Sequence, residues 1–443
     1  METVGKATKI RLFSFSSAPM RAFHMTWFAF FLCFFGWFGI APLMAVVREE
    51  LALTKEQIGN TIIASVAITI VARLAIGWLC DRFGPRIVYT WLLLIGALPV
   101  MGIGLSRSYE SFLLFRLAIG AIGASFVITQ YHTSLMFAPN TVGTANATTA
   151  GWGNLGGGVT QMVMPLIMGG FLFLGISSGM SWRLAMIVPG ALMILTGIAY
   201  YKLTQDAPNG DFRELRARGE LPRVGGEEGS FIAATRDHRV WALFVIYAAC
   251  FGVELTINNI AALYFKDFFS LDLKTAGIIA GLFGLMNIFA RTMGGFVGDR
   301  CGIRWGLRGR VGFMGIVLLL EGMALMVFSQ MTALAIAIVT LVVFSVCVQM
   351  AEGATYSVVP FINKKSLGSV AGIVGAGGNA GAVAAGFLFR SESLTTQQAL
   401  FYLGIAVACA SLLAVLVRFT ASDETTAREE MARALGPVPA PAE

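Results

Sequence analysis

Charged residues are scarce in this chain: only 13% of its 443 residues are Asp, Glu, Lys or Arg, whereas about 25% is usual for a soluble protein. Histidine is rarer still, with three residues, and the six cysteines are scattered without a CxxC pair or a Cys/His spacing. These shortages exclude most soluble folds, a disulfide framework and a zinc site. Hydrophobic residues make up 56% of the chain instead, with 34 Phe and 51 Gly, and they are grouped in long blocks.

The apolar blocks predict the fold class. A helix that crosses a bilayer needs roughly 20 apolar residues, and the chain offers about a dozen such blocks between polar loops. We therefore expect an all-α integral membrane protein with twelve transmembrane helices in two pseudo-symmetric halves of six. The expected spans lie near residues 25–47, 57–80, 87–106, 111–137, 143–174, 184–203, 240–265, 273–298, 311–329, 332–361, 367–389 and 398–419.

The polar segments between and around these spans predict the domain organisation. The longest polar interruption is 204–239, which divides the spans into six and six. The expected units are a cytoplasmic N-terminal segment (1–24), a first bundle (25–203), a cytoplasmic central loop (204–239), a second bundle (240–419) and a disordered cytoplasmic tail (420–443). The first helix has no small-residue cleavage site after it, so we expect it to be retained and not removed as a signal peptide.

Lysine and arginine are distributed unevenly between the two predicted faces. The face that carries both termini holds 22 of the 32 basic residues, the other face holds seven, and three lie inside spans. Because cytoplasmic loops of membrane proteins carry excess Lys and Arg, both termini are predicted to be cytoplasmic. The same bias accounts for the net charge of +7 without a nucleic-acid partner. The expected location is the cell membrane, in a bacterial inner membrane.

Two motifs recur in the two predicted halves. One motif combines glycines with an Asp-Arg pair at the end of the second and eighth spans, and its copies are 218 residues apart. It reads Arg73-x3-Gly77-x3-Asp81-Arg82-x-Gly84-x-Arg86 and then Arg291-x3-Gly295-x3-Asp299-Arg300-x-Gly302-x-Arg304. The other motif links Gly153-Asn154-Leu155-Gly156 in the fifth span to Gly378-Asn379-Ala380-Gly381 in the eleventh. Repeats of this kind are typical of secondary transporters, whose substrate site lies near the midplane between the repeats.

Two arginines lie deep inside the predicted membrane. Arg73 precedes Asp81 by eight residues, which is about 12 Å of helix and close to half of a roughly 30 Å hydrocarbon core. Arg291 precedes Asp299 by the same number of residues. Each buried cation costs about 2.5–3.5 kcal/mol on insertion scales. Two such costs at equivalent positions require an explanation.

Two explanations remain open from the residues alone. Each arginine could pair with a buried carboxylate, Glu254 or Glu352, and simply hold helices together. Alternatively, the two guanidinium groups could converge on an anion, since a planar fork of donors suits a planar oxyanion. A third intramembrane arginine, Arg116, begins the fourth span nearer the opposite face, and we expect it to be a helix-contact residue outside the primary site.

The doubled Gly-x3-Asp-Arg-x-Gly-x-Arg loop resembles that of the major facilitator superfamily, and the resemblance covers essentially the whole chain. In that family the loops form a cytoplasmic latch, and glycines allow helices to approach closely. The resemblance therefore implies gating and structural roles, not substrate contacts, for two sets of residues. They are Gly77, Asp81, Arg82, Gly84, Arg86, Gly295, Asp299, Arg300 and Gly302 in the loops, and Gly153, Gly156, Gly157, Gly378 and Gly381 in the glycine-rich spans.

The glycine-rich runs in the fifth and eleventh spans, together with the midplane arginines, resemble the signatures of the nitrate/nitrite porter family. The implied substrates are nitrate and nitrite, moved by alternating access. The implied substrate residues are Arg73, Arg291, Asn154, Phe126, Tyr247 and Tyr356, and Asn379 supplies a further buried donor. No catalytic constellation, metal site or cofactor motif accompanies them, so we expect a transporter and not an enzyme, acting as a monomer in the lipid bilayer.

The energy source depends on which intramembrane groups can take up a proton. Candidates are Glu254, Glu352 and His132, and the Gly-Val-Glu-Leu-Thr-x-Asn-Asn pattern around Glu254 resembles the proton-coupled, assimilatory branch of the family. Proton-coupled nitrate uptake is therefore the favoured prediction. The alternatives are nitrate/nitrite exchange, transport of another small monoanion, and a nutrient-sensing receptor.

Overall fold

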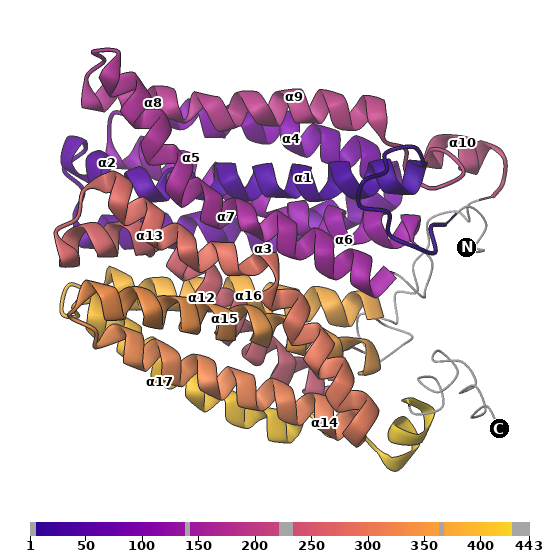
Figure 1. The fold of residues 1–443 in the computed structure, drawn as a ribbon. Coiled ribbons are helices and arrows are strands. Elements are labelled where there is room, and N and C mark those ends of the chain that lie inside the picture. Colours follow the sequence, from indigo (N-terminus) through magenta and orange to yellow (C-terminus); the bar gives the residue numbers. More distant parts are fainter. Residues whose placement is uncertain (1–5, 138–141, 221–233, 363–366, 428–443) are drawn as a thin grey trace.

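The computed structural model describes residues 6–137, 142–220, 234–362 and 367–427, and within them nearly all ordered structure is helical. The chain forms two helical bundles that lie one above the other in Figure 1. The first bundle contains α1 (Ala18–Phe38), α2 (Met44–Glu50), α3 (Lys55–Phe83), α4 (Pro85–Gly102), α5 (Tyr109–Gly120), α6 (Ser125–Met136), α7 (Val142–Phe173), α8 (Ser178–Ala185) and α9 (Ile187–Leu203). A short helix, α10 (Phe212–Ala217), follows it.

The second bundle repeats this arrangement. It contains α12 (His238–Phe269), α13 (Leu273–Leu285), α14 (Ala290–Ser329), α15 (Leu334–Val358), α16 (Leu367–Arg390) and α17 (Thr396–Ser411). The start of α1, helix α10 and the last described residues of the chain lie at the same end of the molecule, on the right of Figure 1. We call this end the terminal face and the opposite end the far face.

The number of membrane crossings follows from one backbone reversal. Within the described residues, eleven helical stretches are long and apolar enough to span a bilayer, but one of them, Leu273–Ser329, has 57 residues. Its helix α14 alone has 40 residues, about 60 Å, which is twice the roughly 30 Å of a hydrocarbon core. The chain turns back inside it at Gly306, whose φ of 74° is left-handed. This stretch therefore crosses twice, and the predicted architecture of twelve helices in two halves is confirmed.

The same capping device reverses the chain in both halves. Gly84 has φ 88°, and the carboxylate of Asp206 lies beside it, accepting hydrogen bonds from the backbone N–H groups of Arg86 (2.8 Å) and Phe212 (2.9 Å). In the second half, Glu424 lies beside Gly306 in the same way and accepts from two backbone N–H groups (2.9 and 3.1 Å). Carboxylates are favourable at these helix N-termini. A Cβ at either glycine would clash with the carboxylate.

The ends of the first and last units differ from the sequence prediction. The sequence predicts a disordered tail over 420–443, but residues 421–427 form a helix. Glu424 of this helix caps the start of the ninth crossing, so a contact distant in sequence orders this part of the tail. Residues 428–443 lie outside the described part. Helix α1 begins at Ala18 and not near residue 25, because Ser17 caps it by accepting from the N–H of Met20 (3.4 Å).

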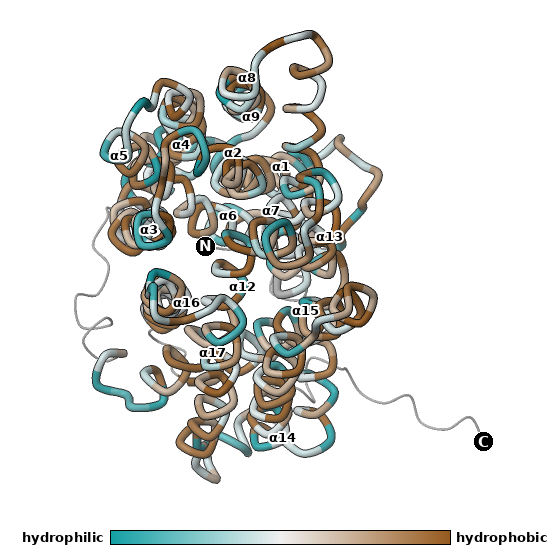
Figure 2. The backbone as a smooth tube through the Cα atoms, turned by 90° about the vertical axis from the view of Figure 1, so that its left-hand side faces the viewer, coloured by the Kyte–Doolittle hydropathy of each residue, from teal (hydrophilic) through white to brown (hydrophobic). Residues whose placement is uncertain are grey.

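Two seams join the halves, and α12 lies between them. Viewed from the far face, α3 lies beside α16 at one seam and α7 beside α13 at the other (Figure 2). Glycine allows the close approach: a Cβ on Gly158 of α7 would lie 2.6 Å from the Cα of Gly284 in α13. Within the first half, a Cβ on Gly156 would lie 2.1 Å from the carbonyl oxygen of Phe31 in α1.

The outer surface of the bundles is apolar, as a lipid-facing surface must be. Large hydrophobic side chains such as Trp91, Ile95 and Leu98 on α4 and Ile316 and Leu320 on α14 are exposed. Much of the tube along the outer helices α14 and α17 is brown in Figure 2. Several buried charges, among them Arg73, Arg291 and Glu254, lie in the interior where the two halves meet.

Candidate functional site

The two midplane arginines lie between the halves. Arg73 comes from α3 in the first half and Arg291 from the start of α14 in the second, and their side chains are only 7% and 5% exposed. They are close enough to interact electrostatically. Two buried cations this close repel each other, so the site needs negative charge from the protein or from a ligand.

Arg73 is held by neutral groups. Its Nη1 donates to the carbonyl oxygen of Gly375 on α16 (2.9 Å), and its guanidinium carbon lies 5.3 Å from the ring centre of Phe126 and 5.7 Å from that of Phe251. Within the described part of the chain, Nε and Nη2 are buried without a hydrogen-bond partner. These two atoms form one edge of the planar guanidinium, the edge that binds an oxyanion through two parallel hydrogen bonds. Arg73 therefore presents a bidentate donor edge that no described protein group engages.

Arg291 contacts both a neutral hydroxyl group and a carboxylate. Its Nη2 donates to the hydroxyl of Tyr247 (3.0 Å), and its Nη1 forms an ion pair with Glu352 of α15 (2.5 Å). Pairing with a buried carboxylate therefore holds for Arg291, whereas Arg73 has no carboxylate contact among the described residues. The two arginines are equivalent in the repeat but not in their surroundings.

Aromatic side chains enclose the space between the arginines. Tyr247 stacks on Phe251 (5.3 Å between ring centres) and meets Tyr356 edge-on (5.0 Å). A Cβ at Gly375 would lie 3.1 Å from the Tyr356 hydroxyl and 3.8 Å from Nη1 of Arg73. The absence of a side chain at this position therefore leaves room for both polar groups. The result is a buried cluster of flat rings with polar groups at its edges.

Two carboxylates lie beside this cluster, and both are fully buried. Glu254 of α12 accepts hydrogen bonds from the amides of Asn154 (3.2 Å) and Asn287 (2.8 Å). Glu352 lies close enough to Glu254 for the two carboxyl groups to interact electrostatically. Two buried carboxylates this close repel each other when both are ionised.

Most of the predicted substrate residues meet at this place. Arg73, Arg291, Phe126, Tyr247 and Tyr356 are all within it. The sequence reasoning missed Phe251, Gly375 and Asn287. Phe251 follows Tyr247 by four residues and so shares its helix face, a spacing that would have identified it.

Two predicted residues and one proton candidate lie differently. Asn154 binds Glu254 across the interface between the halves and not the arginines. Asn379 follows Gly375 by one helical turn, and its buried amide has no partner among the described residues. His132, a candidate for proton coupling, lies away from the arginine cluster. Its Nε2 donates to the carbonyl of Gln205 (2.8 Å), so its Nδ1 accepts from the Tyr200 hydroxyl (2.5 Å). It is a satisfied structural histidine within the first half and does not contact the arginine cluster.

The loop residues form contacts within each half at the terminal face. Asp299 pairs with Arg310, whose Nη1 also donates to the Ser357 carbonyl (3.3 Å), and a Cβ on Gly302 would lie 2.3 Å from Nε of Arg310. Arg86 pairs with Asp211. The side chain of Asp81 lies outside the described part. Arg82 and Arg300 lie over neighbouring Phe rings and do not reach the arginine pair.

Comparison with known proteins supports the architecture over most of the chain. The family model described as the Major Facilitator Superfamily matches residues 26–386. The chain belongs to this superfamily. A solved facilitator-type structure, a bacterial homologue of the human lysosomal transporter Spinster in an inward-facing and occupied conformation, has the same fold, with a TM-score of 0.70, 16% identity, and coverage of 92% of this chain and 98% of its own.

Curated relatives define the branch of the superfamily. The facilitator is 42% identical over 421 residues to "High affinity nitrate transporter 2.5" of Arabidopsis thaliana, covering 95% of this chain and 84% of the relative. It is 30% identical over 479 residues to "Nitrate/nitrite transporter NrtP" of Nostoc punctiforme, covering 92% and 94%. This facilitator is thus a member of the nitrate/nitrite porter family, as its doubled motifs predicted, and it is a transporter and not an enzyme.

Proposed function

We propose that this protein moves nitrate, and also nitrite, across the membrane by alternating access, with the anion bound between Arg73 and Arg291. The observation that carries the proposal is the Nε–Nη2 edge of Arg73, which is buried between aromatic rings and has no partner among the described protein groups. The names of the relatives, which are nitrate or nitrate/nitrite transporters, supply the substrate class.

The chemistry of nitrate fits this edge. Two of its three oxygens can accept the two parallel hydrogen bonds from Arg73. Its flat faces can lie against the rings of Phe126 and Phe251, and the Tyr356 hydroxyl and the Asn379 amide are further polar groups near the same wall. Nitrate is weakly hydrated, so such a site can replace its water shell.

Uptake of an anion needs an energy source. An interior that is negative by 100 mV opposes entry of a monoanion by about 2.3 kcal/mol. The charge count of the site supports proton coupling: with Glu254 and Glu352 both ionised, the four side chains sum to zero, and a bound anion would leave a net buried charge. One proton on the carboxylate pair together with one anion restores neutrality. We therefore propose that a proton on Glu254 or Glu352 accompanies nitrate.

The contacts between the halves support a state closed at the far face. Three ion pairs join the halves there: Arg48 with Asp267 (2.6 Å), Lys266 with Glu49 (3.6 Å) and Arg390 with Glu56 (2.5 Å). Within the described residues, no ion pair joins the halves at the terminal face. We propose that the two bundles rock about the central site, and that the terminal face is cytoplasmic, as the excess of Lys and Arg there favours.

Uptake by purified protein in liposomes tests the proposal. We expect nitrate to accumulate when the exterior is acidic, with no nitrite inside, and Glu254→Gln to reduce the dependence on the pH gradient. Uptake that ignores the pH gradient and requires internal nitrite would replace symport with exchange. If an organic monocarboxylate is transported and nitrate does not compete, nitrate is not the substrate.

A further inference from the structure

A third buried arginine lies apart from the arginine pair. Arg116 of α5 is 1% exposed, and its Nη1 donates to the carbonyl oxygen of Trp37 (3.2 Å). Its Nη2 donates to Oδ1 of Asn259 (2.7 Å), and its Nε has no hydrogen-bond partner among the described residues. Both partners are neutral, so the structure shows a guanidinium buried in the membrane without a carboxylate beside it in the described part of the chain. Such a charge is costly and marks a functional group.

The position of Arg116 is between the far face and the arginine pair. It is seven residues into α5, which begins at Tyr109 at the far face, so it lies roughly 10 Å along its helix. Arg73 is eighteen residues into α3 and lies roughly 27 Å from the same face. An anion that enters from the far face therefore passes the depth of Arg116 before it reaches Arg73.

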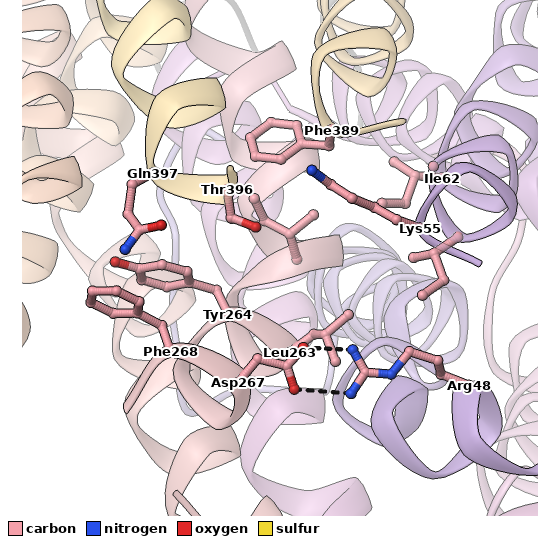
Figure 3. A pocket seen from close by; sticks show the side chains of 13 residues that line it. Arg48, Lys55, Ile62, Leu263, Tyr264, Asp267, Phe268, Phe389, Thr396 and Gln397 are labelled. Carbon is pink, nitrogen blue, oxygen red and sulfur yellow. Dashed lines mark hydrogen bonds and ion pairs between the residues drawn. The ribbon is translucent and has the colours of Figure 1, made fainter. Parts of the chain in front are cut away.

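A cavity of about 360 Å³ opens at the far face directly above this level. Arg48 and Lys55 lie at its rim, and Ile260, next to Asn259 in α12, is part of its lining. In Figure 3 the side chain of Lys55 points across the cavity toward Phe389, while Arg48 is bound to Asp267. At the mouth, Asp267 neutralises Arg48 and Lys55 is the second cation, whereas Arg116 lies deeper along its helix.

The bond between Arg116 and Asn259 crosses the interface between the halves. Arg116 belongs to the first half and Asn259 to the second. If the bundles rock as proposed above, opening of the far face separates Arg48 from Asp267 and draws α5 away from α12, which breaks the Arg116–Asn259 bond. The edge formed by Nε and Nη2 of Arg116 is then free. In the closed state Asn259 Oδ1 occupies the position on this edge that one oxygen of a planar oxyanion would take.

We propose that Arg116 is an outer anion site, which binds a small planar monoanion when the far face is open and which Asn259 occupies when that face closes. The inference rests on the proposed nitrate transport and adds a second binding position on its path. Replacement of the anion by Asn259 during closure displaces it toward Arg73 and Arg291. Arg116 is thus more than the helix-contact residue that its sequence position indicates.

Three variants separate an outer anion site from a simple latch. Asn259→Ala removes the competing oxygen, Asn259→Asp places a permanent carboxylate on Arg116, and Arg116→Gln removes the cation. The measurement is the KM for nitrate added at the far face of liposomes under a fixed pH gradient. We expect Arg116→Gln and Asn259→Asp to raise this KM about tenfold or more, the loss of one charged hydrogen bond, and Asn259→Ala to lower it about twofold.

The grouping of the variants decides the question. If Arg116 only latches the far face, Arg116→Gln and Asn259→Ala break the same bond and must change KM in the same direction, opposite to Asn259→Asp. That grouping, or an unchanged KM in Arg116→Gln, overturns the proposal. Gel filtration and Tm check folding, and Arg116→Lys, which keeps the charge but loses the edge, replaces the Gln variant if that does not fold. Failure of the wild type to transport nitrate would refute the proposed function instead.

Discussion

Replacement of Arg73 by Lys tests the central feature of the site, because it keeps the positive charge and removes the bidentate edge. In the wild type, Nε and Nη2 are both available to the anion. A hydrogen bond between charged groups contributes about 1.5–3 kcal/mol. A lysine ammonium can supply one such bond but not two parallel ones, and it also loses planar contact with the rings of Phe126 and Phe251, worth about 0.5–1 kcal/mol each.

The expected loss is about 2.8 kcal/mol, which corresponds to about a hundredfold weaker nitrate binding. Isothermal titration of purified protein with nitrate measures it directly. Arg300→Lys is the matched control, since Arg300 is an exposed arginine that also lies over a Phe ring (4.9 Å) but is remote from the site; it should change affinity less than about twofold. If Arg73→Lys binds nitrate within about threefold of the wild type, the edge of Arg73 does not hold the anion.

The asymmetry between the arginines gives a comparison within the same experiment. Arg291 is already engaged by Tyr247 and Glu352, and a lysine there can keep the ion pair with Glu352. We therefore expect Arg291→Lys to weaken nitrate binding by about tenfold, less than Arg73→Lys, as the loss of a single charged hydrogen bond. Equal losses in both variants would contradict the unequal roles assigned to them.

Three further predictions concern coupling, packing and pH. Glu254→Gln should preserve nitrate exchange between the two sides while reducing uptake driven by a pH gradient at least about tenfold, and equal loss of both activities would mean that Glu254 only supports the fold. Gly156→Ala should lower the free energy of unfolding by about 1–3 kcal/mol, because the added Cβ would meet the Phe31 carbonyl. Gly169→Ala is the control, since nothing lies within 4 Å of its added Cβ. An equal Tm for the two variants would contradict the packing argument. Burial raises the pKa of Asp206 from 3.8 to about 6, so the folded state binds this proton more tightly than the unfolded state. Stability should therefore rise as the pH falls from about 7 to about 4, by up to about 3 kcal/mol, and Asp206→Asn should abolish this part of the pH dependence of Tm.

The architecture was predictable because its causes are local or periodic. Hydrocarbon excludes unsatisfied backbone polar groups, so each long apolar block had to become a helix, and the repeat at 218 residues placed Arg73 and Arg291 at the same depth in the two halves. The aromatic residues were harder to assign. Phe126 and Tyr247 came from family resemblance, while Phe251 was missed although it lies one turn from Tyr247, because 34 Phe residues give many such spacings.

The partners of each charge could not be derived from the sequence. The pattern gives Arg73 and Arg291 the same local motif, yet only Arg291 has a carboxylate beside it, because α15 brings Glu352 to it while α16 brings only the Gly375 carbonyl to Arg73. Likewise, His132 looked titratable until its contacts with Tyr200 and Gln205 were known.

Residue types and their spacing thus determined the number of spans, the two halves and the depth of the buried arginines, since these depend on distance along a helix. Which arginine has an edge without a described protein partner, where Asn154 points and which acids lie close to each other were decided only by tertiary structure. The physical reason is that electrostatic energy in a membrane interior depends on contacts of a few ångströms between helices. Those contacts join residues that are distant in sequence, such as Asn154 and Glu254, which are 100 positions apart.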